Sequence, residues 1–163
     1  MKKTLAPMSS TVHPKPNVIV SCRDKDGRNN ALAIGFAANV SIVPPMVMVA
    51  ITPLRHSHGI IKESGEFVLN LPVKGFEKEY EYLGTHSGRD GDKLAAMDIE
   101  WEEAEMVSAP MLCACPVCVE CRVVDSIKPG SHELFVGEVL AVHCEEKYVD
   151  KNGKIRWDEL ELL

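Results

Sequence analysis

The chain has 163 residues, a formal net charge of -6 and a hydrophobic fraction of 45%, which is the composition of one folded globular domain. This acidic balance, with no run of lysine or arginine, argues against a nucleic-acid partner, because phosphate binding needs a concentrated basic surface. No apolar run approaches the roughly 18 residues that span a bilayer, and the N-terminus lacks the apolar segment of a signal peptide. We therefore expect a cytoplasmic protein without membrane contact.

The first half of the chain predicts mostly strands. A β-branched run begins at residue 17, and Asp26-Gly27 after it is typical of a hairpin turn. Pro44-Pro45 interrupts the apolar residues that follow, and Gly65 is expected to end a helix. The expected elements are strands over 17–22, 31–38, 46–51 and 66–71 and a helix over 55–64, with the first three strands forming an antiparallel meander.

The second half predicts one further helix, a shorter helical piece and two long strands. Phe76, Tyr80 and Leu83 share a helical face at spacings of four and three, and Gly84 is expected to end that helix. The remaining expected elements are a short helix over 92–97 and strands over 118–127 and 132–144. The sequence therefore predicts a mainly β fold, a barrel of about six strands with a few short helices.

Five motifs follow one another over residues 14–145. They are Asp26-Gly27-Arg28-Asn29-Asn30 leading through Ala38-Asn39-Val40-Ser41 to Pro44-Pro45; Arg55-His56-Ser57-His58; Gly65-Glu66-Phe67-Val68-Leu69-Asn70-Leu71-Pro72; Gly84-Thr85-His86-Ser87-Gly88 with Asp92-Lys93; and Glu120-Cys121 with His132 to Val139. In this order they resemble the flavin reductase-like, FMN-binding split-barrel family. The resemblance implies one domain over 1–163, a Greek-key split β-barrel, FMN as cofactor, and a homodimer with FMN near the subunit interface.

An FMN site must bind a phosphate, which favours backbone N–H groups, hydroxyls and a cation. Spacing alone allows a plainer interpretation, in which Ser57 caps the following helix and Arg55 is a surface charge. The loop from Gly84 to Gly88 is open to two interpretations, a flavin contact or a simple connection, and Lys93 fits a solvated helix start equally well. With the resemblance, the phosphate and loop candidates are Ser41, Thr52, Arg55, His56, Ser57, His58, Gly84, Ser87, Gly88 and Lys93.

The flavin ring needs polar partners at its edge and a thin wall against its face. An amide side chain both donates and accepts, and small residues around Gly35 let a flat ring approach the backbone. A turn accounts for Asn29 as well as a flavin contact does. The ring candidates are Asn30, Ala37, Asn39 and Val40.

His132 is the candidate catalytic residue. The resemblance implies a histidine beside the flavin face where a nicotinamide stacks, and a neutral imidazole can orient an amide or supply a proton. The alternative is a histidine at a hairpin shoulder that faces water. No Gly-x-Gly-x-x-Gly motif follows a strand, so NAD(P)H is expected as a transient donor without a domain of its own.

Four of the six cysteines lie between Cys113 and Cys121. The interpretations are buried structural thiols, which we favour, a redox pair of Cys115 and Cys118, or a metal site. On a continuous strand Cys113, Cys115 and Cys121 would share one face and Cys118 the other, so we expect no bound metal.

Three functions remain open. The first is an FMN-binding oxidoreductase, an NAD(P)H-dependent flavin or ferric reductase. The second is a flavoredoxin-like electron carrier that another redox protein reduces. The third is a flavin-free metal-binding module that uses the cluster from Cys113 to Cys121.

Overall fold

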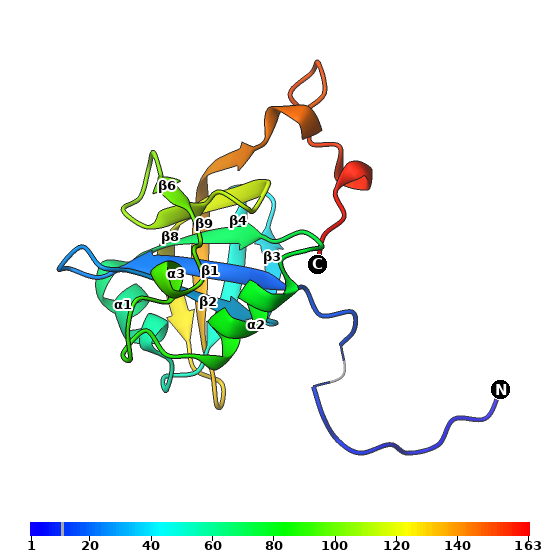
Figure 1. The fold of residues 1–163 in the computed structure, drawn as a ribbon. Helices are drawn as coiled ribbons and strands as arrows, with labels where there is room; N and C mark the ends of the chain where they lie inside the picture. Colours follow the sequence, from blue (N-terminus) through cyan, green and yellow to red (C-terminus); the bar gives the residue numbers. More distant parts are fainter. Residues whose placement is uncertain (11) are drawn as a thin grey trace.

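The computed structural model describes residues 1–10 and 12–163 (Figure 1). Its strands are β1 (Val18–Arg23), β2 (Asn29–Ile34), β3 (Ala37–Ser41), β4 (Met46–Ile51), β5 (Glu66–Leu71), β6 (Trp101–Glu103), β7 (Pro110–Leu112), β8 (Val117–Ile127) and β9 (Glu133–Cys144). Its helices are α1 (His56–Ser64), α2 (Glu77–Thr85) and α3 (Lys93–Ala96), with the short 3-10 helices η1 (Glu146–Tyr148) and η2 (Trp157–Glu159) after the last strand. No helix in these two ranges is both long and apolar enough to cross a membrane.

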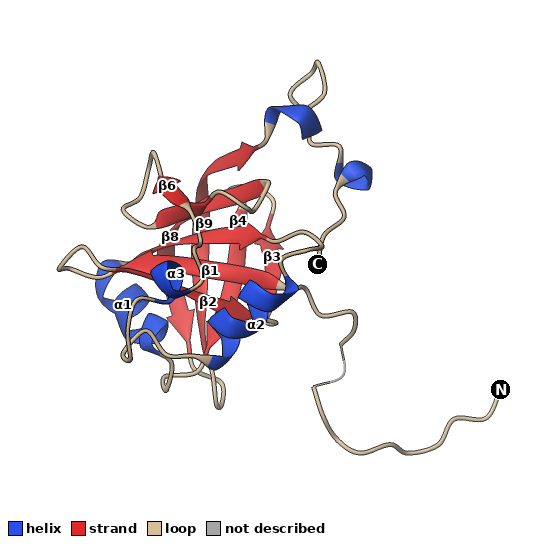
Figure 2. Ribbon diagram, viewed as in Figure 1, coloured by secondary structure: helices blue, strands red, loops and turns tan. Residues whose placement is uncertain are grey.

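Seven strands form one antiparallel sheet in the order β2-β1-β5-β8-β9-β4-β3. The two edge strands, β2 and β3, are separated in the chain by only Gly35 and Phe36. Neighbouring strands lie about 4.8 Å apart, so two residues cannot cross a flat sheet of this width. The sheet therefore curls into an open barrel, with α2 and α3 against its outer face and α1 packed on the interior cluster through Ile60 and Ile61 (Figure 2). Beside this opening, the Ala50 N–H donates to the Phe36 carbonyl at 2.9 Å, which continues the β3–β4 ladder by one pair.

Two apolar clusters hold the fold together. The barrel interior contains Phe67, Phe135 and Ile61, all at most 1% exposed. Gly137 of β9 makes room for this packing, because a Cβ there would lie 2.7 Å from the Phe67 Cζ atom. The second cluster lies on the opposite face of the sheet, where Leu83 of α2 and residues of β1, β5 and β7 pack together. Alternation along β1 and β5 sends successive side chains to the two clusters.

Several predictions from the sequence are confirmed. The strands expected over 46–51 and 66–71 have those bounds, and the long strands near residues 118–127 and 132–144 are β8 and β9. The helix α1 ends at Gly65, which adopts a left-handed φ of 69° and donates its N–H to the Ile61 carbonyl at 2.8 Å. A glycine at this position pays no steric penalty for that conformation.

Other predictions are wrong. The strand expected over 31–38 divides at Gly35-Phe36, where the chain passes from one sheet edge to the other, so the segment is not a continuous meander. Gly84 does not end α2, which continues to Thr85, whose hydroxyl donates to the Glu81 carbonyl at 2.8 Å. The sequence also missed β6 and β7, because strands of three residues are too short for a periodic pattern.

Candidate functional site

Three cavities, which together we call the groove, lie end to end beside β2 and β4. The narrow cavity has a volume of about 140 Å³, the middle cavity about 260 Å³ and the wide cavity about 800 Å³. Leu32 and Arg55 line both the narrow and the middle cavity. Phe36, Ala50 and His132 line both the middle and the wide cavity. Each cavity therefore borders the next.

The narrow cavity forms where α1, β2 and the loop before α3 meet. Asn30 of β2 donates from Nδ2 to the Ser57 hydroxyl at 2.7 Å, which joins the strand to the first turn of α1. Gly88 packs directly on this pair, because a Cβ there would overlap the Asn30 amide and lie 2.9 Å from the His56 Cδ2 atom. A side chain at position 88 would therefore force Asn30 or His56 to move. The glycine is thus part of its shape.

The start of α1 faces the same cavity. Arg55 is the N-cap residue, with extended backbone and no side-chain hydrogen bond to the first turn. The prediction that Ser57 caps this helix is therefore wrong, since Ser57 lies one residue inside it. The buried thiol of Cys22 lies behind Ser57. Burial raises the pKa of this thiol to about 12, although a hydrogen bond with Ser57 acts in the opposite direction. An uncapped helix start leaves N–H groups for an outside acceptor, and an anion suits it best.

Lys93 gives the narrow cavity a buried cation. The residue is only 4% exposed, and its Nζ donates to the carbonyl oxygens of Leu83 at 3.0 Å and His86 at 3.3 Å. Burial lowers its pKa to about 8. Arg55 and Arg89 line the same cavity, and the part of its lining that the structure describes contains no Asp or Glu. A buried cation without a carboxylate partner is costly, so this cavity is electrostatically prepared for an anion.

The middle cavity is a slot against bare backbone. Gly35 and Ala33 of its lining present little side chain, and Thr52 supplies a hydroxyl at the end of β4. The Phe36 and His132 rings meet edge to face with their centroids 5.2 Å apart. The His132 Nδ1 lies 2.8 Å from the Ser131 hydroxyl, so one ring nitrogen has a local partner. A flat heterocycle can stack in such a slot with polar groups near its edge.

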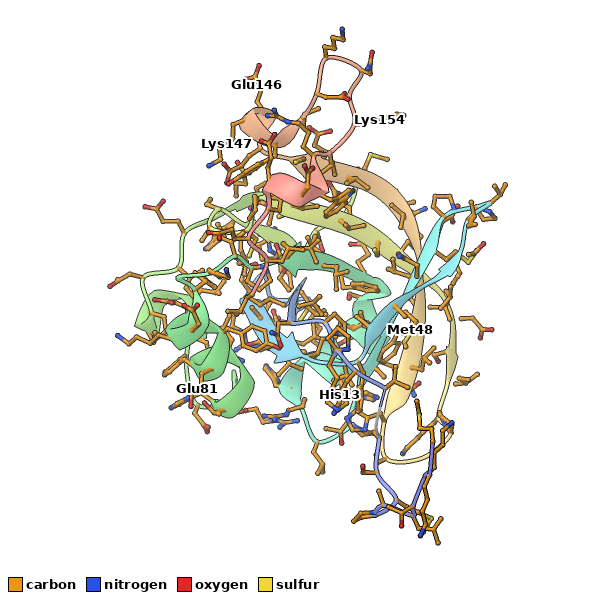
Figure 3. All side chains as sticks on the ribbon, turned by 90° about the vertical axis from the view of Figure 1, so that its right-hand side faces the viewer. His13, Met48, Glu81, Glu146, Lys147 and Lys154 are labelled. Carbon is orange, nitrogen blue, oxygen red and sulfur yellow. The ribbon has the colours of Figure 1, made fainter. Side chains whose placement is uncertain are left out.

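The wide cavity lies between the N-terminal segment and the barrel. Figure 3 shows this segment, with His13 labelled, passing close to the β3–β4 hairpin, on which Met48 is labelled. Pro14, Lys15 and Pro16 form one wall, and residues of β3, β4 and β9 form the other. Most of the lining is apolar, in contrast to the narrow cavity.

His58 lies on the far side of α1 from the groove. Its Nε2 is 2.7 Å from a Glu133 carboxylate oxygen, and its ring packs on Phe135 with centroids 5.4 Å apart. Glu133 also accepts from Lys62 at 3.0 Å and from the Ser126 hydroxyl at 3.0 Å. These hydrogen bonds, the Lys62 one first and the His58 one next, lower the pKa of Glu133 to about 2. The contacts of Glu133 with His58 and Lys62 therefore connect β9 to α1.

The structure brings most of the predicted site residues together. The narrow cavity is lined by Asn30, Arg55, His56, Ser57, Ser87, Gly88 and Lys93; Thr52 and His132 line the middle cavity, and Ala37 and His132 the wide one. His58 faces Glu133 instead, and Gly84 lies on α2 against Ala33. Asn39, Val40 and Ser41 lie farther along the edge strand β3 and are absent from the described lining of the groove.

Sequence reasoning missed several groove residues, among them three that carry a charge or an aromatic ring. Lys15 precedes the first strand, Phe36 lies in the link between β2 and β3, and Arg89 follows Gly88. Arg89 could have been found from the sequence, because it is a cation directly after the glycine-containing loop. Lys15 and Phe36 reach the site only through the closure of the barrel, which no local pattern signals.

The buried cysteines divide between the two clusters, whereas Cys113 is exposed, so the favoured interpretation of buried thiols is wrong for that residue. Cys115 and Cys118 are buried together on the outer face of the sheet, whereas Cys121 lies in the barrel interior. The expected sharing of one face by Cys115 and Cys121 is wrong, because residues 113–116 form a turn before β8. Burial raises the pKa of Cys118 and of Cys121 to about 12, which suppresses the reactive thiolate. Within residues 1–10 and 12–163, no three or more His, Cys, Asp or Glu side chains are placed to hold a metal ion.

Comparisons with known proteins agree with this architecture. A family model described as the flavin reductase like domain matches residues 8–157. The solved flavoredoxin of Methanosarcina acetivorans is 30% identical with a TM-score of 0.92, covering 100% of this chain and 86% of that chain. An FMN-binding protein from Thermus thermophilus is 27% identical with a TM-score of 0.80, covering 95% of this chain and 85% of that chain.

A curated relative, an NADH:riboflavin 5'-phosphate oxidoreductase of Streptomyces pristinaespiralis, is 28% identical over 125 residues. The match covers 75% of this chain and 66% of the relative. The predicted fold class, a mainly β split barrel with short helices, is confirmed by the likeness to the solved structures. From the family model and these matches together, the chain belongs to the flavin reductase-like family.

Proposed function

We propose that this protein is an oxidoreductase that binds FMN along the groove, with the phosphate in the narrow cavity and the ring in the middle cavity. The observation that carries the proposal is the buried, carboxylate-free Lys93 beside the uncapped start of α1. FMN, when bound, supplies reversible one- and two-electron chemistry, while the protein supplies position and electrostatics. The proposal extends to this chain the flavin specificity that the Streptomyces relative's name states for that enzyme.

The residues of the narrow cavity fit a phosphate in charge and in donor type. Lys93 and Arg55 are cations, Ser57 has a hydroxyl, and the first turn of α1 provides backbone N–H groups. A phosphate there would replace the missing carboxylate partner of Lys93. It would also hold the Ser87–Gly88 loop against Asn30, which excludes water from this end of the groove.

In the middle cavity the protein's own residues position a ring and control access to it. Phe36 and His132 stand between the middle and wide cavities. His132 has one nitrogen engaged with Ser131, so its second nitrogen is oriented to donate or accept toward a ligand. We assign His132 the role of orienting a donor or acceptor molecule at this point.

The electron donor separates two forms of the proposal. The Streptomyces relative is named as an NADH-dependent enzyme, which supports NAD(P)H as a transient donor here. The Methanosarcina protein is named a flavoredoxin, which supports a carrier that receives electrons from another redox protein. The larger wide cavity beside His132 favours the first form, because it leaves room for a small organic molecule next to the ring site.

We also propose a homodimer that forms through the β3–β4 hairpin. Ile42 and Val43 at its tip are 90% and 88% exposed. Exposed apolar side chains in one region mark an interaction surface. In a dimer, Asn39 and Ser41 of the hairpin would approach the cofactor of the partner subunit, which gives these predicted residues a role away from their own groove.

Flavin binding and reduction test the function directly. We expect the full chain to quench FMN fluorescence on binding, with riboflavin at least about 100-fold weaker because it lacks the phosphate. Anaerobic bleaching of bound FMN by NADH or NADPH supports the enzyme, and bleaching only by a reduced ferredoxin-type protein supports the carrier. Failure to bind FMN, or equal affinity for riboflavin, contradicts the phosphate assignment. The homodimer is tested by comparing the sedimentation of the Ile42→Glu variant with that of the unchanged chain, and only the unchanged chain should sediment as a dimer.

A further inference from the structure

The wide cavity combines an apolar body with positive charge at one end. Phe36, Met48 and Leu134 provide apolar walls, and the prolines at 14, 16 and 129 add rigid ones. Lys15 and His132 are the titratable side chains in its described lining, which has no Asp or Glu. A neutral apolar ligand would make no ion pair with this charge. A multiply charged polar ligand would lose its hydration against the apolar walls, which costs free energy.

Lys15 is held at the mouth between the wide and the middle cavity. It lines both of them, and the prolines on either side restrict the backbone around it. Its stem lies over Gly35, where a Cβ would be 3.9 Å from the Lys15 Cδ atom. The Nζ atom is 5.3 Å from the Phe36 ring centroid. The lysine side chain therefore passes over the backbone of Gly35 toward the aromatic pair formed by Phe36 and His132.

The charge of Lys15 is available to a ligand. Its side chain is exposed, and the ion pairs between residues in the ranges 1–10 and 12–163 do not include it. Its neighbour in the site is the face of an aromatic ring, a weak partner for an ammonium group compared with a carboxylate.

From this combination we propose that the wide cavity is a substrate site for flat, conjugated organic acids. The conjugated ring packs against Phe36, Met48 and the proline wall, and the carboxylate or phenolate pairs with Lys15. Because Phe36, Ala50 and His132 are shared with the middle cavity, such a ring lies next to whatever occupies that cavity. The use of the acid in electron transfer rests on the proposed function, whereas its binding does not. Lys15 is then a specificity-determining residue.

The test compares 2-naphthoate with 2-naphthamide, which share a ring system and differ in charge. Calorimetric titration of the full chain, FMN-loaded and flavin-free, should give an affinity about fivefold higher for the acid, the effect of one partly solvated ion pair. Lys15→Gln should remove that preference and leave the amide unchanged, while Lys15→Arg should retain it. Lys78→Gln, which changes an exposed lysine on α2, is the matched control.

A second variant locates the ligand. Ala38→Phe adds bulk on β3 inside the wide cavity and should weaken both probes. Equal binding of acid and amide by the unchanged chain, equal weakening of both by Lys15→Gln, or full binding by Ala38→Phe would each overturn the proposal. A chain that takes up no FMN but still prefers the acid through Lys15 would contradict the proposed function alone, so the two failures are distinguishable.

Discussion

The two ends of the groove recognise ligands by opposite means. The narrow cavity is small, cationic and bounded by a helix start and a glycine loop, with Lys93 buried among carbonyl oxygens. The wide cavity is apolar, bounded partly by the N-terminal segment, and carries its charge on an exposed lysine. Tight geometry around a buried charge favours one fixed anion, whereas a roomy apolar space tolerates several ring systems. Cofactor binding and substrate choice are thereby separated along one ligand path.

The largest effect is expected from Lys93→Met. Loss of the buried cation should weaken FMN binding by about 100-fold, because a charge-assisted contact is removed. Riboflavin, which has no phosphate, should keep its affinity. Fluorescence titration of both flavins measures the difference. An equal loss for both would mean that Lys93 supports the loop and does not bind phosphate.

The substitutions Gly88→Ala and Gly130→Ala add the same methyl group at the narrow and at the wide end of the groove. A Cβ at 88 would overlap the Asn30 amide, while a Cβ at 130 meets nothing within 4 Å. We expect about 20-fold weaker FMN binding for the first, from a misplaced Ser57 contact, and no change for the second. Both variants should melt cooperatively by circular dichroism. Equal FMN affinities in the two variants would contradict the assignment of the phosphate to the narrow cavity.

The affinity for FMN should fall at alkaline pH. Burial lowers the pKa of Lys93 to about 8, so its charge is present below that pH and is lost as the pH rises through it. A bound phosphate favours the charged form and shifts the decline upward. We expect about tenfold weaker binding at pH 9.5 than at pH 7, measured by fluorescence titration. Lys93→Met should show a flat profile over this range, and a fall of the same size in that variant would assign the titration to another group.

A smaller effect on the cofactor than in the Lys93 and Gly88 variants is expected from Glu133→Gln. Lys62 and His58 hold the pKa of Glu133 at about 2, so its stabilising effect is present above the ordinary carboxyl pKa of about 4.3. That stabilisation is lost as the pH falls from there toward 2. The variant should therefore melt at a lower temperature at pH 7, and the difference should shrink below pH 4. FMN affinity should change by only about threefold, since α1 shifts without losing a phosphate contact.

Sequence alone predicted the central strands, α1 with its Gly65 stop, and most of the narrow-cavity residues. These depend on local signals: a glycine after a helix, a polar motif after a strand, a glycine-serine loop. It failed at Gly35-Phe36, where curling of the whole sheet turns one apparent strand into two opposite edges. Lys15 and Phe36 entered the site through that same closure. Cys115 and Cys118 share a cluster because of a turn that an apolar, cysteine-rich run did not signal.

The link between β2 and β3 also has a dynamic consequence. Adjacent strands of the sheet are joined along ladders of several paired residues, whereas β2 and β4 are not hydrogen-bonded neighbours in the described sheet. The Ala50–Phe36 hydrogen bond beside this opening is the end pair of the β3–β4 ladder. Local opening there breaks fewer bonds than separating any two paired strands. The barrel can therefore open locally at this point, which lies at the junction of the middle and wide cavities. Amide hydrogen exchange at Ala50 should be faster than at Val49, and a ligand that spans the junction should slow it.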